Sequence, residues 1–188
     1  MRSDQYVVPG PPILLPLGVL LMVVSWFVLR RRDRLTPLRL IAAWCAGWYA
    51  VAVLGATLLP LHVSWGAEPQ LFRINPIPFV EFRPRDFALN VMMTLPFAAL
   101  VHMVFGIRDK GRVIRLGLLL SASIEITQCL LILTVHDNRW AETSDIIANG
   151  SGVVLGYLAF HRLLRFPVIG RVVDGASPAR PGLERLPG

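Results

Sequence analysis

Five stretches of mostly apolar residues dominate this sequence, and they restrict the fold more than any other feature. A helix needs about 20 such residues to cross the hydrocarbon core of a bilayer, and inside that core only helices and closed barrels satisfy their backbone hydrogen bonds. Charged residues make up 16% of the chain, whereas soluble domains carry about 25%. We therefore predict an all-α polytopic membrane helix bundle. The predicted spans are Pro12–Leu29, Leu38–Leu61, Phe87–Gly106, Val113–Val135 and Asp145–Leu164.

Basic residues are unevenly distributed among the segments that connect these spans. Lys and Arg are frequent around residues 30–39, at residues 108–115 and after the fifth span, and they are sparse before the first span and in the fourth connection. Positively charged loops stay on the cytoplasmic side, so we predict that the N-terminus lies outside and the C-terminus inside. The net charge of +7 then reflects topology and neighbouring anionic lipids, and we expect no nucleic-acid partner.

The same pattern divides the chain into three parts. Residues 1–37 contain the N-terminal tail, the first span and a basic cytoplasmic connection, and residues 38–165 contain the other four spans. Residues 166–188 are predicted to form a disordered cytoplasmic tail, because Gly, Pro and Arg are abundant there. The 2 cysteines lie inside apolar runs, and no metal-binding or nucleotide-binding motif is present. We therefore expect no metal and no cofactor.

Polar side chains interrupt the last three spans, mostly in the half of the bilayer predicted to be outer. Glu125 and Gln128 are three residues apart, so they share one face of the fourth span. A charged side chain at the bilayer centre costs at least about 2.5–3.5 kcal/mol and usually faces a bundle interior or a wet cavity. We therefore predict an outward-facing polar pocket between spans three, four and five, covered by the second and fourth connections. Its predicted ligand-binding residues are Asn75, Arg83, Asn90, Glu125, Gln128, Arg139, Asp145 and Asn149.

Short motifs in this region resemble the VanZ-like family of bacterial membrane proteins. They are RINPIPFVEF before the third span, NVMMTLPFAAL within it, SIEITQ in the fourth span and NRWAETSDIIANGSGVVLGY leading into the fifth. Ala98 departs from the family, in which a glycine commonly follows the Pro-Phe pair of the third span. The resemblance implies a multi-pass protein of the bacterial cytoplasmic membrane, associated with resistance to teicoplanin-type glycopeptide antibiotics. The residues that match the family's motifs, in chain order, are Asn75, Pro78, Phe79, Asn90, Pro96, Phe97, Glu125, Gln128, Arg139, Asp145, Asn149 and Gly152.

Three functions are compatible with the predicted pocket. A binding or resistance protein would hold a membrane lipid, a lipid-linked cell-wall precursor or a lipoglycopeptide, with Arg83, Arg85 and Arg139 pairing phosphate or carboxylate groups. An intramembrane enzyme acting on a lipid-linked precursor would use Glu125 and Asp145 as candidate catalytic carboxylates. A membrane assembly partner would use a face of small residues. The ligand, any reaction and the oligomeric state stay open at this point.

The same polar and small residues also have structural interpretations. Glu125 can bond across helices, and Asp145 can cap the fifth span and favour its dipole. Gly152 and Gly156 form a pair typical of close helix packing. Pro96 has no N–H to donate, so we expect it to kink the third span.

Overall fold

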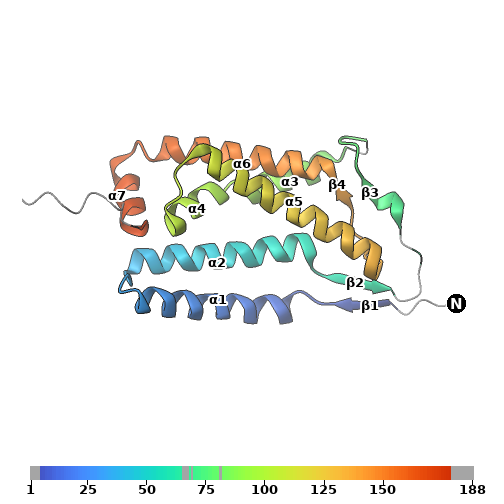
Figure 1. The fold of residues 1–188 in the computed structure, drawn as a ribbon, viewed down its shortest axis with the longest axis horizontal. Helices are drawn as coiled ribbons and strands as arrows, with labels where there is room; N and C mark the ends of the chain where they lie inside the picture. Colours follow the sequence, from blue (N-terminus) through green and yellow to red (C-terminus); the bar gives the residue numbers. More distant parts are fainter. Residues whose placement is uncertain (1–4, 65–67, 69, 81, 179–188) are drawn as a thin grey trace, which may run out of the picture.

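Helices form most of the protein in its computed structural model, which describes residues 5–64, 68, 70–80 and 82–178 (Figure 1). The elements are β1 (Gln5–Val8), α1 (Pro11–Arg31), α2 (Pro37–Leu58), β2 (Leu61–Ser64), the 3-10 helix η1 (Leu71–Arg73), β3 (Ile74–Asn75), α3 (Pro84–Thr94), α4 (Phe97–Phe105), α5 (Lys110–Val135), β4 (Ala141–Glu142), α6 (Thr143–Leu163) and α7 (Pro167–Ala176). Four segments, namely α1, α2, α3 with α4, and α5, are long and apolar enough to cross a membrane. The helix α6 passes the same test together with α7, from which it is bent by 114°. The predicted all-α membrane helix bundle of about five spans is confirmed.

Successive long helices run in opposite directions, so the bundle has two distinct ends (Figure 1). At one end, which we call the strand end, β1 pairs antiparallel with β2 and β3 pairs parallel with β4. At the other, which we call the basic end, lie the turn between α1 and α2, the turn between α4 and α5, and α7. The positive-inside rule predicts that the basic end faces the cytoplasm, and this orientation stays a prediction.

Local sequence signals define the hairpin of α1 and α2. Pro11 and Pro37 begin the two helices, where the missing N–H has no intrahelical partner to lose. Thr36 caps α2, because its Oγ1 accepts a hydrogen bond from the backbone N–H of Arg39 at 3.3 Å. The helix α1 packs mainly on α2 and leaves most of its apolar surface exposed, as expected of a helix that faces lipid.

Pro96 interrupts the third predicted span, which the structure divides into α3 and α4. Proline has no N–H to donate, and its ring clashes with the carbonyl one turn earlier. The segment before the break packs tightly on α6 at Gly152 and Gly156. A Cβ atom added at Gly152 would lie closer than 3.0 Å to the carbonyl oxygen of Val91, and one at Gly156 equally close to that of Leu95. The predicted role of this glycine pair in close helix packing is confirmed, and the packing is within the chain.

The C-terminal region differs from the disordered tail predicted for residues 166–188. Part of it forms α7, which begins at Pro167. Val173 and Ala176 of this helix are buried, and α7 packs on α2 and α4. An apolar stripe on one side of a short helix is sufficient for such docking, but the high content of Gly, Pro and Arg concealed it. Residues 179–188 lie outside the described part of the chain.

Two hydrogen bonds after α7 connect three helices at the basic end. The Oγ of Ser177 donates to the carbonyl of His102 in α4 at 3.2 Å. The carbonyl of Ser177 accepts from Nη2 of Arg39 in α2, also at 3.2 Å. Ser177 is only 1% exposed, so these bonds are shielded from solvent and fix the end of α7 against the bundle.

Candidate functional site

A cavity of about 630 Å³ opens at the strand end of the bundle. Its walls come from the last turn of α2, from α3, from α5, from the linker between α5 and β4, and from the first turn of α6. We call it the strand-end cavity. Five of the eight predicted ligand-binding residues line it, namely Arg83, Asn90, Gln128, Arg139 and Asp145.

Glu125 does not line the cavity but lies directly behind its wall. The side chain is buried at 8% exposure, and its Oε2 accepts a hydrogen bond from the backbone N–H of Glu142 at 2.9 Å. Glu142 belongs to β4, and the side chain of Glu142 lines the cavity. Glu125 therefore holds the cavity wall in place, and the structural interpretation of its position has a definite partner.

Gln128 joins α5 to the end of α2. Its Nε2 donates to the carbonyl of Thr57 at 2.9 Å, and Thr57 Oγ1 in turn donates to the carbonyl of Val53 at 2.7 Å. The Oε1 of Gln128 is buried and has no hydrogen-bond partner among the described residues. Gln128 lines the cavity, but this oxygen lies beneath its surface.

Arg83 forms the centre of an ionic group at the cavity mouth. Its guanidinium pairs with the carboxylate of Glu142 and, at 3.4 Å, with that of Asp86. It also lies over the ring of Trp140, 5.0 Å from the centroid. Glu142 is further held by the Oγ of Ser144, which donates to its Oε2 at 3.0 Å. Much of the donor capacity of Arg83 is thus used by the protein.

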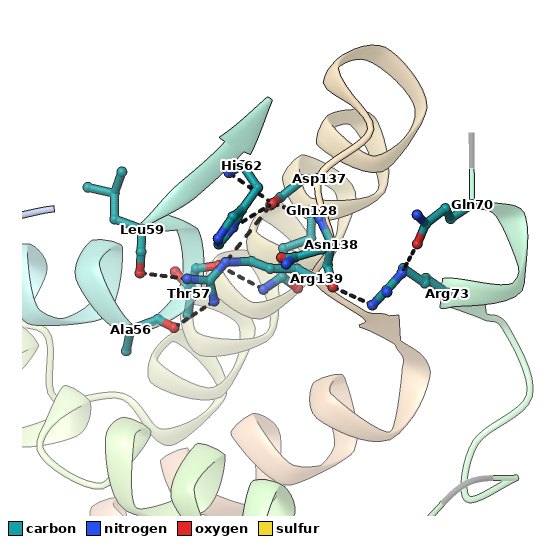
Figure 2. A network of polar contacts seen from close by, with 10 residues as sticks. All are labelled: Ala56, Thr57, Leu59, His62, Gln70, Arg73, Gln128, Asp137, Asn138 and Arg139. Carbon is teal, nitrogen blue, oxygen red and sulfur yellow. Dashed lines mark hydrogen bonds and ion pairs between the residues drawn. The ribbon is translucent and has the colours of Figure 1, made fainter. Parts of the chain in front are cut away.

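Arg139 is fixed by a second network, which Figure 2 shows. Its Nη1 donates to the carbonyl of Ala56 at 3.1 Å and its Nη2 to that of Leu59 at 2.5 Å. These are carbonyls at the C-terminal end of α2, where helices lack intrahelical donors and favour a cation. Burial lowers the pKa of the Arg139 guanidinium, and the nearby Asp137 carboxylate acts in the opposite direction.

Asp137 organises that network although it was not among the predicted site residues. It is fully buried at 0% exposure, and its Oδ1 accepts from the backbone N–H of His62 at 3.2 Å and that of Asn138 at 2.9 Å. Its Oδ2 lies 3.9 Å from Nε of Arg139. The carboxylate joins β2 to the linker between α5 and β4 (Figure 2), so it shapes the roof of the cavity from outside.

Asp145 and Asn90 line the cavity together, from α6 and α3 respectively. The alternative interpretation of Asp145 as the helix cap is wrong, because Glu142 occupies the N-cap position of α6. Asp145 lies in the first turn, where the helix dipole favours a carboxylate, and its side chain faces the cavity.

Asn75 and Asn149 lie outside the lining. Asn75 pairs in register with Glu142 between β3 and β4. Asn149 is 1% exposed, and its Nδ2 donates to Oγ of Ser121 at 3.0 Å, while its carbonyl accepts from Oγ1 of Thr94 at 2.9 Å. These two residues position α6 and the strand end and do not reach the cavity.

The lining therefore offers more acceptors than free donors. Its carboxylates belong to Asp86, Glu142 and Asp145, while its two guanidiniums are largely engaged by the protein. No group of three potential metal ligands from His, Cys, Asp and Glu occurs in the described ranges. An arrangement of this kind suits a ligand that donates hydrogen bonds or carries a cationic group. Lining residues that were not predicted as ligand-binding are Ala56, Thr57, Asp86, Leu89, Met92, Met93, Trp140 and Glu142.

Comparison with known proteins gives one match. A family model described as VanZ/LLP1 matches residues 46–165, a range that begins inside α2, ends after α6 and includes every residue that lines the strand-end cavity. No curated protein and no solved structure gives a significant match. Since the matched region exceeds half of the 188 residues and agrees with the motifs in the sequence, the chain belongs to the VanZ/LLP1 family.

Proposed function

We propose that this membrane protein binds an amphiphilic component of the bacterial cell envelope in the strand-end cavity, at the outer face of the cytoplasmic membrane. The ligand class is a lipid-linked cell-wall precursor or a lipoglycopeptide, and binding would link the protein to glycopeptide resistance of the teicoplanin type. The observation that carries the proposal is the composition of the cavity. One side presents carboxylates from Glu142 and Asp145, and the other presents apolar side chains of α3.

The apolar side of the cavity lies beside surface suited to lipid. Leu89 and Met92 line the cavity and are 49% and 55% exposed, so they extend from the lining to the outer surface of the bundle. A ligand bound there would keep its lipid portion in the bilayer while its head group meets the polar wall. An acceptor-rich wall favours a head group with peptide amides or amines over a bare phosphate.

Binding is tested with the full protein in nanodiscs and a labelled undecaprenyl-linked precursor, captured by a photo-reactive residue at Met93. Replacing a carboxylate that accepts a hydrogen bond removes about 1.5–3 kcal/mol, so Asp145→Asn should weaken capture by about 10-fold to 150-fold. Asp174→Asn is the matched control, because Asp174 lies in α7, far along the bundle, with 75% of its side chain exposed.

Three outcomes would contradict the proposal. Equal capture by both variants would show that the ligand does not bind in the strand-end cavity. Capture of bulk phospholipid alone would show that the proposed ligand class is wrong. A new product from the labelled precursor would show catalysis instead of simple binding. Asp145, which lines the cavity, would then be the candidate acid or base. In cells, Asp145→Asn should change teicoplanin sensitivity while Asp174→Asn leaves it unchanged.

A further inference from the structure

A second hollow surface extends along the bundle from the basic end to Val53 of α2, outside the lining of the strand-end cavity. It consists of an apolar cavity of about 450 Å³ between α1, α2, α4 and α5, and a smaller one of about 240 Å³ beside the turn between α1 and α2. The two are adjacent, because they share part of their walls, and we call them together the basic-end groove. The shared wall residues are Ser25, Val28, Ala43, Val104 and Phe105.

The charged end of the groove is entirely basic. Arg32, Arg34 and Arg39 line the smaller cavity, and no acidic residue lines either part. Within the described ranges none of the three forms an ion pair with a carboxylate. Arg39 donates to the Ser177 carbonyl through Nη2, and its buried Nε has no hydrogen-bond partner among the described residues. The site therefore holds three cationic groups that no carboxylate of the described residues pairs with.

Neighbouring arginines at this turn are occupied differently. The guanidinium of Arg30 lies 5.2 Å from the ring centroid of Trp26, and that of Arg31 lies 4.2 Å from the centroid of Phe27. Stacking of this kind satisfies a guanidinium on an aromatic face. The arginines that line the groove are thus a distinct set within the basic turn, and their position is not a consequence of general basicity.

The apolar part has the length of one lipid leaflet. Along α2 its lining runs from Ala43 to Val53, which is about 15 Å at the helical rise of 1.5 Å per residue. Half of a hydrocarbon core of about 30 Å is the same length. Three lining residues of α2 have small side chains, namely Ala46, Gly47 and Ala50. They leave room for an extended acyl chain between α2 and α4.

We propose that the basic-end groove binds one anionic phospholipid. Arg32, Arg34 and Arg39 hold its phosphate group, and one acyl chain lies along α2 from Ala43 to Val53. The lipid would fill the space between the hairpin of α1 and α2 and the rest of the bundle, and would come from the leaflet at the basic end. This site is independent of the ligand proposed for the strand-end cavity.

The test measures lipid retention by the full protein. Protein is exchanged into nanodiscs of phosphatidylcholine containing a minor fraction of phosphatidylglycerol, extracted in mild detergent, and analysed by native mass spectrometry for bound lipid. Each basic residue near a membrane surface contributes about fivefold in affinity for anionic lipid. The triple variant Arg32→Gln, Arg34→Gln, Arg39→Gln should therefore reduce the preference for phosphatidylglycerol by about 100-fold, which abolishes selective retention.

Two further variants separate a specific site from general attraction. The variant Lys110→Gln, Arg112→Gln, Arg115→Gln removes the same charge from the other basic turn, whose residues do not line the groove, and should keep the preference. Ala50→Leu fills the apolar part with all charges intact and should lower retention. Equal loss in both triple variants, or full retention in Ala50→Leu, would overturn the proposal, as would a wild-type protein that retains both lipids equally.

Discussion

Glu125 provides the sharpest test of how the strand-end cavity is built. In Glu125→Ala the backbone N–H of Glu142 loses the carboxylate that accepts its hydrogen bond at 2.9 Å. A buried donor left without a partner costs about 1–3 kcal/mol, so we expect a destabilisation of about 2 kcal/mol. The folded-to-unfolded ratio should fall about 30-fold.

Glu125→Gln should behave differently, because glutamine presents an amide oxygen at the same position and can still accept from the backbone. We expect it to cost less than about 1 kcal/mol. Both variants are compared by titrating the protein in mild-detergent micelles with sodium dodecyl sulfate and following tryptophan fluorescence. Ile126→Ala is the control for side-chain truncation, because Ile126 is 60% exposed on the outer surface of α5 and should tolerate the change.

Two results would refute this reasoning. If Glu125→Gln destabilises the protein as much as Glu125→Ala, the hydrogen bond to Glu142 is not the main contribution of the side chain. If Glu125→Gln keeps full stability but loses capture of the labelled precursor, the ligand uses the carboxylate itself. In the second case Glu125 would be a ligand-binding residue rather than a positioning residue.

Three other substitutions have defined outcomes. Gly156→Ala should destabilise the bundle by at least about 1–3 kcal/mol through overpacking, whereas Gly150→Ala, whose nearest neighbour is a flexible side-chain end, should stay within about 1 kcal/mol in the same titration. Arg83→Gln and Glu142→Gln should be non-additive in a double-mutant cycle by about 1 kcal/mol, since 41% of the Arg83 side chain is exposed and solvent screens the pair; additivity would show that the pair is inert. Arg139→Lys cannot reach both carbonyls at the end of α2, so hydrogen exchange should accelerate in that last turn, and unchanged exchange would contradict the capping role.

Most of the fold could be predicted from the sequence because hydropathy and helix geometry are local properties. The lengths of the apolar runs predicted the spans, and Pro96 predicted the break between α3 and α4. The strands β3 and β4 could not be predicted, because they have two residues each and exist only through their mutual pairing. The helix α7 was missed because the high content of Gly, Pro and Arg around it concealed the apolar stripe that docks against α2 and α4.

The candidate site was predictable only in part, for a related reason. Helical spacing indicates that Glu125 and Gln128 share a face, but it does not indicate which neighbour occupies that face. The structure gives Glu125 a backbone partner and leaves one buried oxygen of Gln128 without a hydrogen-bond partner among the described residues. Asp137 could not be identified, because its position depends on the path of the linker between α5 and α6. No helical or strand periodicity describes such a path.

The hydrogen bond between Arg39 and Ser177 joins residues that are 138 positions apart in the chain. During synthesis α2 leaves the ribosome early, and its partner at the basic end is among the last described residues to be made. A nascent chain that ends before α7 therefore lacks the bonds by which Ser177 joins α2 to α4, and this end of the bundle is completed only after residue 177 has been translated. A reporter fused directly after Pro178 would sit on that late contact, so a fusion protein made for localisation needs a long flexible linker or an N-terminal attachment.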